Sequence, residues 1–219
     1  KPMARTTALG RQMVDAAQRH RIRLLGPNCL GVMRPQLGVN ATFAHASALK
    51  GSIGLISQSG ALCAAILDWA KPNNVGFSTV VSLGTSSDVD FGEVLEYMIS
   101  DPRTESIFLY VEGIRDARRF MSALRSAARI KPIILFKTGR HEQHGVRGEA
   151  SVGEASLADA VFDAAMRRAG VVRVQNIGQL FFAARAFASG FRPRLEALAI
   201  ITNGAGPGAI AADRAGDLS

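Results

Sequence analysis

The feature that most constrains the fold is a regular alternation of short apolar runs with helix-length segments. The apolar runs predict strands at residues 52–57, 79–82, 106–111, 131–137, 171–174 and 197–202. Helices are predicted between and after them at residues 61–71, 91–100, 116–128, 156–170, 177–189 and 208–218. Strands that alternate with helices of this length form βαβ units. We therefore expect an α/β protein with parallel sheets, helices on both faces and right-handed crossovers.

The part of the chain before residue 51 does not follow this rhythm. Residues 7–20 predict an amphipathic helix, and residues 23–25 predict a short strand. That strand runs into a tight turn at residues 26–31, marked by Gly, Pro and Asn. Residues 35–50 have no sustained period and are expected to be a linker. Because the sequence starts without methionine and stops inside a predicted helix, we expect a fragment of a multidomain protein.

Composition narrows the class of protein. The chain has 219 residues, 47% of them hydrophobic, and its longest apolar runs are strand-sized, so we expect a real core and no membrane partner. Residues 1–20 lack the apolar stretch of a signal peptide. Cys29 and Cys63 have neither CxxC nor metal-ligand spacing. These features predict a cytoplasmic protein without a metal site.

The net charge of +8 has two interpretations. It could serve nucleic-acid binding, or it could be a basic surface that faces the phosphates of small ligands. Five arginines fall on one predicted helix, at residues 116–128 and its flanks, without interleaved aromatic residues. This pattern favours small anionic ligands, and no nucleic-acid partner is expected.

Polar residues follow several predicted strands at the sheet edge where ligands bind in open parallel sheets. Ser57, Ser59 and Gly60 lie at the start of a predicted helix, where hydroxyls and unpaired amides can bind phosphate. The alternative for Ser59 is a simple helix cap. Glu112 ends another apolar strand. It is either a functional carboxylate, which orients an imidazole or acts as a general base, or an ordinary solvated loop residue.

Two further turns carry weaker signals. Gly26, Pro27 and Asn28 form a tight turn in which the Asn amide can bind the polar edge of a ligand. Asn203 and Gly204 open a glycine loop whose backbone can approach a phosphate, although it lacks the spacing of a P-loop or a dinucleotide fingerprint.

The motifs occur in one order that resembles the NDP-forming acyl-CoA synthetases, relatives of succinyl-CoA synthetase. Residues 24–31 are similar to the turn that closes the family's CoA-binding domain, and residues 56–60 to the helix start that cradles phosphohistidine. Residues 84–92 resemble the substrate-side loop, and residues 110–113 the strand whose glutamate supports the histidine. Residues 197–208 look like the opening of a further flavodoxin-like domain.

This resemblance implies a domain plan. Residues 1–34 would be the end of a Rossmann-like CoA-binding domain, and residues 35–50 a linker. Residues 51–150 would form a succinyl-CoA-ligase-like flavodoxin domain, and residues 151–219 would begin a second flavodoxin-like domain. The implied ligand is CoA or acyl-CoA. Nucleotide would bind only through an ATP-grasp domain that lies outside this chain. Further copies of the same protein, in a homo-oligomer, are among the expected partners.

The position of the family's phosphorylated histidine departs from the pattern. Members usually carry Ser-His-Thr-Gly there, whereas an ungapped alignment between the flanking motifs places Ser151 at the histidine and Val152 at the threonine. An imidazole can take and release a phosphoryl group near pH 7, but a serine hydroxyl is a weak nucleophile without a base. The scaffold therefore resembles the family while its phosphoryl carrier is missing.

Two functions follow from the resemblance. The first is an acyl-CoA-binding module, the regulatory part of a bacterial protein that fuses this module to a GNAT-type lysine acetyltransferase; residues 116–129 are particularly similar to such fusions. The alternative is an active NDP-forming acyl-CoA synthetase in which His144 replaces the missing histidine. That alternative requires a seven-residue slip within a stretch whose two ends align without gaps.

Overall fold

The computed structural model describes residues 8–45, 47–139, 152–190 and 197–217. The helices are α1 (Ala8–Arg19), α2 (Gly60–Ala70), α3 (Phe91–Ser100), α4 (Ala117–Ala128), α5 (Val152–Ala169), α6 (Ile177–Ala188) and α7 (Ala205–Gly216), with a short 3-10 turn, η2 (Pro35–Leu37). The strands are β1 (Gly31–Arg34), β2 (Val39–Thr42), β3 (Lys50–Ser57), β4 (Phe77–Ser82), β5 (Ser106–Val111), β6 (Ile133–Lys137) and β7 (Val172–Val174).

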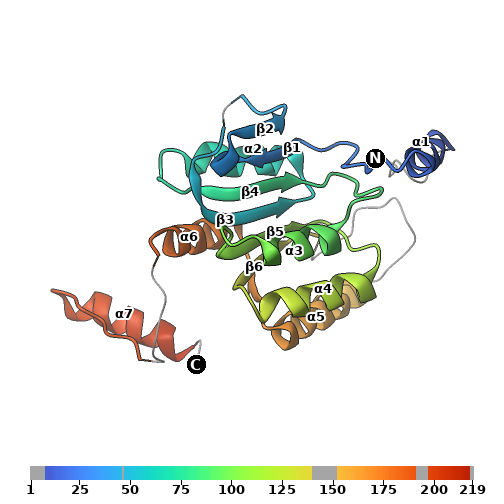
Figure 1. Cartoon of the computed structure of the whole chain (residues 1–219). Helices are drawn as coiled ribbons and strands as arrows, with labels where there is room; N and C mark the ends of the chain where they lie inside the picture. The colour runs from blue at the N-terminus through green and yellow to red at the C-terminus, as the bar shows by residue number, and fades with distance from the viewer. Residues whose placement is uncertain (1–7, 46, 140–151, 191–196, 218–219) are drawn as a thin grey trace.

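The strands form one seven-stranded sheet in the order β2-β1-β4-β3-β5-β6-β7 (Figure 1). Strands β4, β3, β5, β6 and β7 are parallel, and their order along the sheet is that of a flavodoxin-like fold. In register, Leu55 of β3 lies between Val80 of β4 and Phe108 of β5. The prediction of a parallel sheet is confirmed for these strands, and an antiparallel hairpin, β1–β2, extends the sheet beyond β4.

Two apolar cores lie on opposite faces of the sheet. Successive residues of a strand point to opposite faces, so Ile107 and Leu109 of β5 enter one core while Phe108 enters the other. Helices α3, α4 and α5 cover the first face, and α2 and α6 cover the second. The two helices on the second face are joined by the stacked rings of Trp69 and Phe181, whose centroids are 4.0 Å apart. Helices thus cover both faces, as predicted.

Side chains placed at the helix starts explain where α2, α3 and α4 begin. The Ser59 hydroxyl accepts a hydrogen bond from the Leu62 amide at the start of α2. Asp90 caps α3 and forms a capping box with Glu93. Asp116, predicted as a cap, accepts from the amide of Arg119 at 2.9 Å. These local bonds satisfy amides that lack a partner within the helix.

Three segments before and within the sheet differ from expectation. Residues 23–25 are not a strand. The predicted linker at residues 35–50 contains η2, β2 and the first residue of β3. β2 was missed because its four residues, none of them buried, are too short a segment to stand out as a strand, and its pairing with β1 defines it instead. The strand predicted at residues 171–174, placed in a second domain, is the edge strand β7 of this same sheet.

The C-terminal part also differs. Helix α5 begins at Val152, so Ser156 lies inside the helix rather than at its cap. Residues 197–202 form no strand, because no other strand of the described chain pairs with them. Helix α7 begins at Ala205 and includes part of the predicted glycine loop. In Figure 1, α7 lies apart from the sheet, and none of its residues is buried.

Within the described part of the chain, no helix combines the length and the hydrophobicity needed to cross a membrane.

Candidate functional site

The candidate site lies where the order of the parallel strands reverses, between β3 and β5. In open α/β sheets, ligands bind in the crevice at the carboxyl ends of the strands at this point. Ser57 ends β3 and Val111 ends β5, so Gln58 and Glu112 start the two turns that flank the crevice. The fold therefore brings the predicted phosphate residues and the predicted carboxylate to one edge of the sheet.

The serines at the start of α2 are partly used within the protein. Ser57 is fully buried, and its hydroxyl donates to the backbone oxygen of Ser59 at 2.8 Å and accepts from the Ser59 amide at 3.2 Å. The Ser59 hydroxyl caps α2, as the alternative interpretation held, but it accepts in that bond and keeps its own proton to donate. The amide of Gly60 has no partner among the hydrogen bonds of the described residues.

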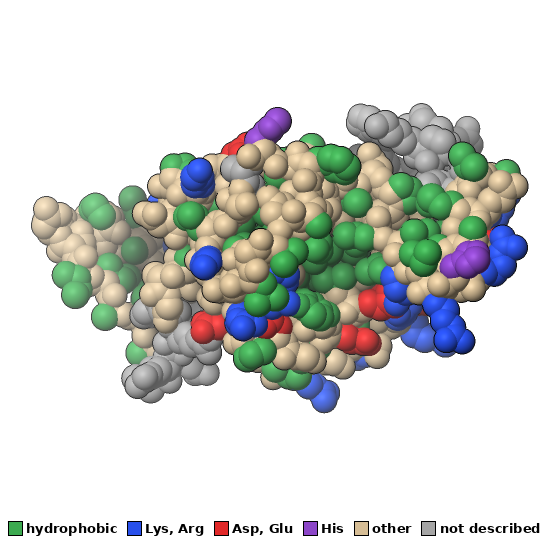
Figure 2. All heavy atoms as spheres, turned by 45° about the horizontal axis from the view of Figure 1, so that its top comes forward, with side chains coloured by type: hydrophobic (Ala, Val, Ile, Leu, Met, Phe, Trp, Pro, Cys, Tyr) green, Lys and Arg blue, Asp and Glu red, His purple; other side chains and the backbone are tan. Residues whose placement is uncertain are grey.

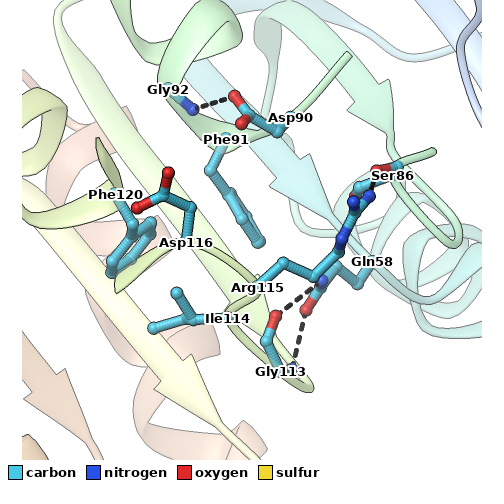
Figure 3. Close-up of a pocket in the computed structure, with 10 residues that line it drawn as sticks. All are labelled: Gln58, Ser86, Asp90, Phe91, Gly92, Gly113, Ile114, Arg115, Asp116 and Phe120. Carbon is cyan, nitrogen blue, oxygen red and sulfur yellow. Dashed lines mark hydrogen bonds between the residues drawn. The ribbon is translucent and has the colours of Figure 1, made fainter. Parts of the chain in front are cut away.

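A residue that the sequence did not single out, Gln58, joins the two turns. Its side-chain oxygen accepts from the amides of Glu112 at 2.6 Å and Gly113 at 3.0 Å. Its side-chain nitrogen donates to the Gly113 carbonyl at 2.8 Å. Figure 3 shows this pairing between Gln58 and Gly113. The Glu112 side chain itself is on the exposed surface.

The predicted ligand turn at residues 26–31 is bonded to the loop that follows β4. The amides of Thr85 and Ser87 donate to the carbonyls of Pro27 and Gly26, each at 3.0 Å, and the Val89 amide donates to the Leu24 carbonyl at 3.1 Å. The two segments are thus held together mainly through their backbones.

Left-handed backbone conformations shape both segments. Gly26 has φ of 98° and Asn28 φ of 59° in the turn, while Gly84 has φ of 58° in the loop. A Cβ atom at Gly84 would lie 2.3 Å from the Pro27 oxygen. Glycine is therefore required at residue 84 both by its φ and by the close approach of the turn.

The turn at residues 26–31 also packs against the start of α2. The Leu30 amide donates to the Ser82 hydroxyl at 2.9 Å, at the end of β4. A Cβ atom at Gly60 would lie 3.3 Å from the Leu30 nitrogen. Gly26, Pro27 and Asn28 are therefore part of the same group of turns as the start of α2.

Charged side chains tie the outer rim of the site together. Arg23 forms ion pairs with Asp88 at 3.0 Å and Glu93 at 2.6 Å, and its hydrogen bond to Asp88 is the main cause that raises the pKa of its guanidinium. Arg119 of α4 pairs with Asp90 at 3.4 Å and with Glu93 at 3.5 Å. These pairs are exposed, so each contributes little to stability by itself.

A small pocket opens between Gln58 and the starts of α3 and α4 (Figure 3). Phe91, Ile114 and Phe120 supply its apolar wall. Arg115 reaches across to the loop after β4 and donates to the Ser86 carbonyl. The lining of the pocket thus combines an apolar wall with polar side chains, those of Gln58, Asp90 and Asp116 among them.

Figure 2 shows the side chains on one face of the molecular surface. Hydrophobic side chains line a hollow between the sheet and the end of the molecule that carries α1, with acidic side chains at its lower rim. Lys and Arg side chains gather at the α1 end of this view and are otherwise scattered singly. The visible face therefore has no continuous basic stripe.

Tyr110, next to the end of β5, is tied to the end of β6. Its hydroxyl lies 3.2 Å from the Thr138 hydroxyl. Burial raises the pKa of the Tyr110 phenol, the bond to Thr138 lowers it, and the nearby Glu112 carboxylate raises it further. The phenol is therefore neutral near pH 7 and serves as a hydrogen-bonding group.

Two sets of predicted residues do not join this site. Asn203 and Gly204 are on the separate α7 segment, where the Gly204 amide donates to the Thr202 hydroxyl at 3.2 Å. Ser151 and its alternative His144 lie outside the described residues. The grouped residues are therefore those of the turn at 26–31, the start of α2 and the β5–α4 turn.

Residues 50–187 match the family described as the succinyl-CoA ligase like flavodoxin domain. The chain belongs to this family. The match covers the sheet from β3 to β7 together with helices α2 to α6. It includes the start of α2 and the β5–α4 turn, whereas the turn at residues 26–31 lies before it.

Relatives extend the similarity over nearly the whole chain. The ADP-forming acetate–CoA ligase I of Archaeoglobus fulgidus is 39% identical over 94% of this chain, which matches 30% of that protein. The alpha subunit of ADP-forming acetate–CoA ligase I of Pyrococcus furiosus is 39% identical over 93% of this chain and 44% of that subunit. The chain thus spans less than half the length of either relative.

A solved structure has the same fold. It is the dinucleotide-forming acetyl-coenzyme A synthetase 1 of Ca. Korarchaeum cryptofilum in complex with phosphate and ADP, which is 31% identical. The TM-score is 0.84, with 95% of this chain and 46% of that chain covered.

Proposed function

We propose that this chain is the part of an acyl-CoA synthetase-like protein that holds CoA or acyl-CoA beside a phosphate-binding site. The observation that carries the proposal is the joining of the turn at residues 26–31, the loop at residues 84–90 and the start of α2 at one sheet edge. The relatives support it, since they are acetate–CoA ligases and an acetyl-CoA synthetase whose structure holds phosphate and ADP.

The CoA side of the site is the turn at residues 26–31. Its carbonyls at Gly26 and Pro27 are already bonded to the loop after β4, so the turn is preorganised. Asn28 is exposed, and its side chain makes no hydrogen bond with any described residue. Its amide is therefore the group of this turn that is available to the polar edge of a ligand.

The phosphate side is the start of α2. The Gly60 amide and the proton of the Ser59 hydroxyl are both available, and the helix dipole adds a favourable field for an anion. The buried Ser57 hydroxyl is already bonded to the Ser59 backbone, so its role is to shape the turn. Glu112 lies across the crevice, where its carboxylate can orient a partner group.

Titrations of the chain with inorganic phosphate and with CoA test this division. Ser59→Ala should weaken phosphate binding and Asn28→Ala should weaken CoA binding, each by roughly tenfold or more if a charge-assisted hydrogen bond is lost. Ser100→Ala is the matched control, because Ser100 lies at the far end of α3 and bonds only within its helix. Phosphate binding that is equal in wild type and Ser59→Ala would contradict the assignment of the phosphate side.

The loss of phosphoryl transfer is a separate part of the proposal, based on Ser151 in the sequence. A protein with serine at this position should take no acid-labile phosphate from labelled ATP or GTP, while acyl-CoA binding persists. Ser151→His need not restore transfer, because Val152 also departs from the family's threonine. Acid-labile label on His144 of the complete protein would overturn this part and support the active-ligase alternative.

The role of the complete protein is the widest part of the proposal. A regulatory function beside a GNAT-type acetyltransferase rests on the likeness of residues 116–129 to such fusions, whereas the relatives named above are ligases. An ATP-grasp domain or subunit would bind the nucleotide in either case. Acetyl transfer to lysine that responds to acyl-CoA in the complete protein would support the regulatory role, and ADP-dependent release of CoA would support the ligase.

A further inference from the structure

Gln58 occupies a special place in the crevice at the strand-order reversal. It directly follows β3, and its backbone amide donates to the Tyr110 carbonyl of β5 at 3.2 Å. Its side chain then bonds the turn after β5, so one residue joins the two strands and the turn beyond them. No other side chain is hydrogen-bonded to the backbone of Glu112 or Gly113 within the described part of the chain.

The chemistry of these bonds requires an amide. The side-chain oxygen of Gln58 accepts from two backbone amides, which uses both of its lone pairs, and the nitrogen donates to the Gly113 carbonyl. The three partners fix the orientation of the amide, because an exchange of oxygen and nitrogen would break all three bonds. A carboxylate keeps the two acceptor bonds but sets an oxygen against the Gly113 carbonyl, and an apolar side chain keeps none.

We infer that Gln58 is a positioning residue, which fixes the turn carrying Glu112 against the start of α2 so that the two turns form one rigid rim around a bound phosphate. We call the three hydrogen bonds from the Gln58 side chain to the backbone of Glu112 and Gly113 the clamp. The inference rests on the proposed function for the identity of the ligand, whereas the clamp is independent of that function. Ser59 and Gly60 follow Gln58 directly in the chain, so the side chain that holds Glu112 belongs to the same short segment as the phosphate donors.

Two measurements on the full chain test the inference. Hydrogen exchange tests whether Gln58 holds the turn after β5, and phosphate titration tests whether this hold affects phosphate binding. In Gln58→Met, the amides of Glu112 and Gly113 should exchange roughly tenfold faster or more, because each loses its acceptor. Phosphate affinity should fall at the same time, by about threefold to tenfold, although Gln58→Met removes none of the assigned phosphate donors. Gln58→Glu should give intermediate exchange, since it retains an acceptor for both amides.

Gln36→Met is the matched control. Gln36 also bonds backbone through its side chain, to the Gly51 carbonyl at 3.3 Å, but at the opposite edge of the sheet. Gln36→Met should leave the exchange rates of the Glu112 and Gly113 amides and the phosphate affinity unchanged.

Unchanged exchange at Glu112 and Gly113 in Gln58→Met would overturn the clamp. Faster exchange with unaltered phosphate affinity would overturn its positioning role. If the wild type itself binds no phosphate, the proposed function fails, and the exchange result alone then supports or overturns the clamp.

Discussion

Replacing Gly84 with alanine tests whether the turn at residues 26–31 is held by the loop after β4. The new Cβ atom would lie 2.3 Å from the Pro27 oxygen and 2.6 Å from the Asn28 oxygen. Ordinary contact begins at 3.4 Å, so the turn and the loop have to separate by about 1 Å. The backbone itself adds a cost, because φ at Gly84 is 58°.

The expected loss can be worked from these contacts. Separation of the segments weakens the bonds from Thr85 to Pro27 and from Ser87 to Gly26, now 3.0 Å each. Two hydrogen bonds contribute about 1–3 kcal/mol together, and the left-handed alanine costs about 1–2 kcal/mol. Gly84→Ala should therefore lower the free energy of unfolding by about 2–5 kcal/mol, measured by urea titration.

Gly38→Ala isolates the backbone part of this cost. Gly38 has φ of 69°, similar to Gly84, but a Cβ atom there would meet nothing within 4 Å. It should lose only about 1–2 kcal/mol. If Gly84→Ala were no more destabilising than Gly38→Ala, the contact between the loop and the turn would not hold the site together, and the reasoning would be refuted.

Two further predictions concern the core on the α2–α6 face. Burial raises the pKa of the Cys63 thiol from 9.0 to about 12, so the folded protein keeps a proton that the unfolded chain loses. The free energy of unfolding should therefore fall as pH rises from about 9 to 12, with Cys63 contributing up to about 1.4 kcal/mol per pH unit. Urea titrations of Cys63→Ala should show a smaller slope, because the contribution of the Tyr110 phenol remains. Phe181→Ala should destabilise more than Phe182→Ala, because Phe181 stacks on Trp69 whereas Phe182 is 73% exposed. The stack adds about 0.5–1.5 kcal/mol beyond the buried area, and equal thermal unfolding of the two variants would argue against it.

The sequence predicted the elements whose signals are local. Buried apolar runs identified β3 and β5, and Asp116 marked the start of α4. It could not predict features that depend on distant partners. β2 is a short segment without a buried residue and is a strand because it pairs with β1. Residues 197–202 are mostly apolar but have no pairing strand within the described chain. The number of strands in the sheet is likewise set by pairing. For this reason the sequence placed residues 171–174 in a second domain, although they form β7 at the edge of this sheet.

The same division applies to the candidate site. Ser59 and Gly60 could be predicted as candidate phosphate-binding residues because small polar residues between a strand and a helix have a known local role. Gln58 was missed, since nothing in the sequence relates it to Glu112 and Gly113, which are more than fifty positions away. The only available signal was a glutamine directly after a strand, at the point where the strand order reverses. That point can be recognised only once the topology of the sheet is known.

The turn at residues 26–31 and the loop after β4 are held together mainly by backbone groups, so the position of the loop depends little on the side chains that it offers to a ligand. The amides of Thr85, Ser87 and Val89 make these contacts, and an amide is present whatever side chain the residue carries, proline excepted. Residue type matters at Gly84, where a Cβ atom would meet the turn, and at two residues whose side chains bond it. The Thr85 hydroxyl donates to the Pro27 carbonyl at 3.2 Å, and the Asp88 carboxylate accepts from the Leu24 amide at 2.8 Å. A substitution elsewhere in the loop that fits its surroundings keeps the backbone bonds, so it can alter what the loop offers to a ligand while the position of the loop stays the same.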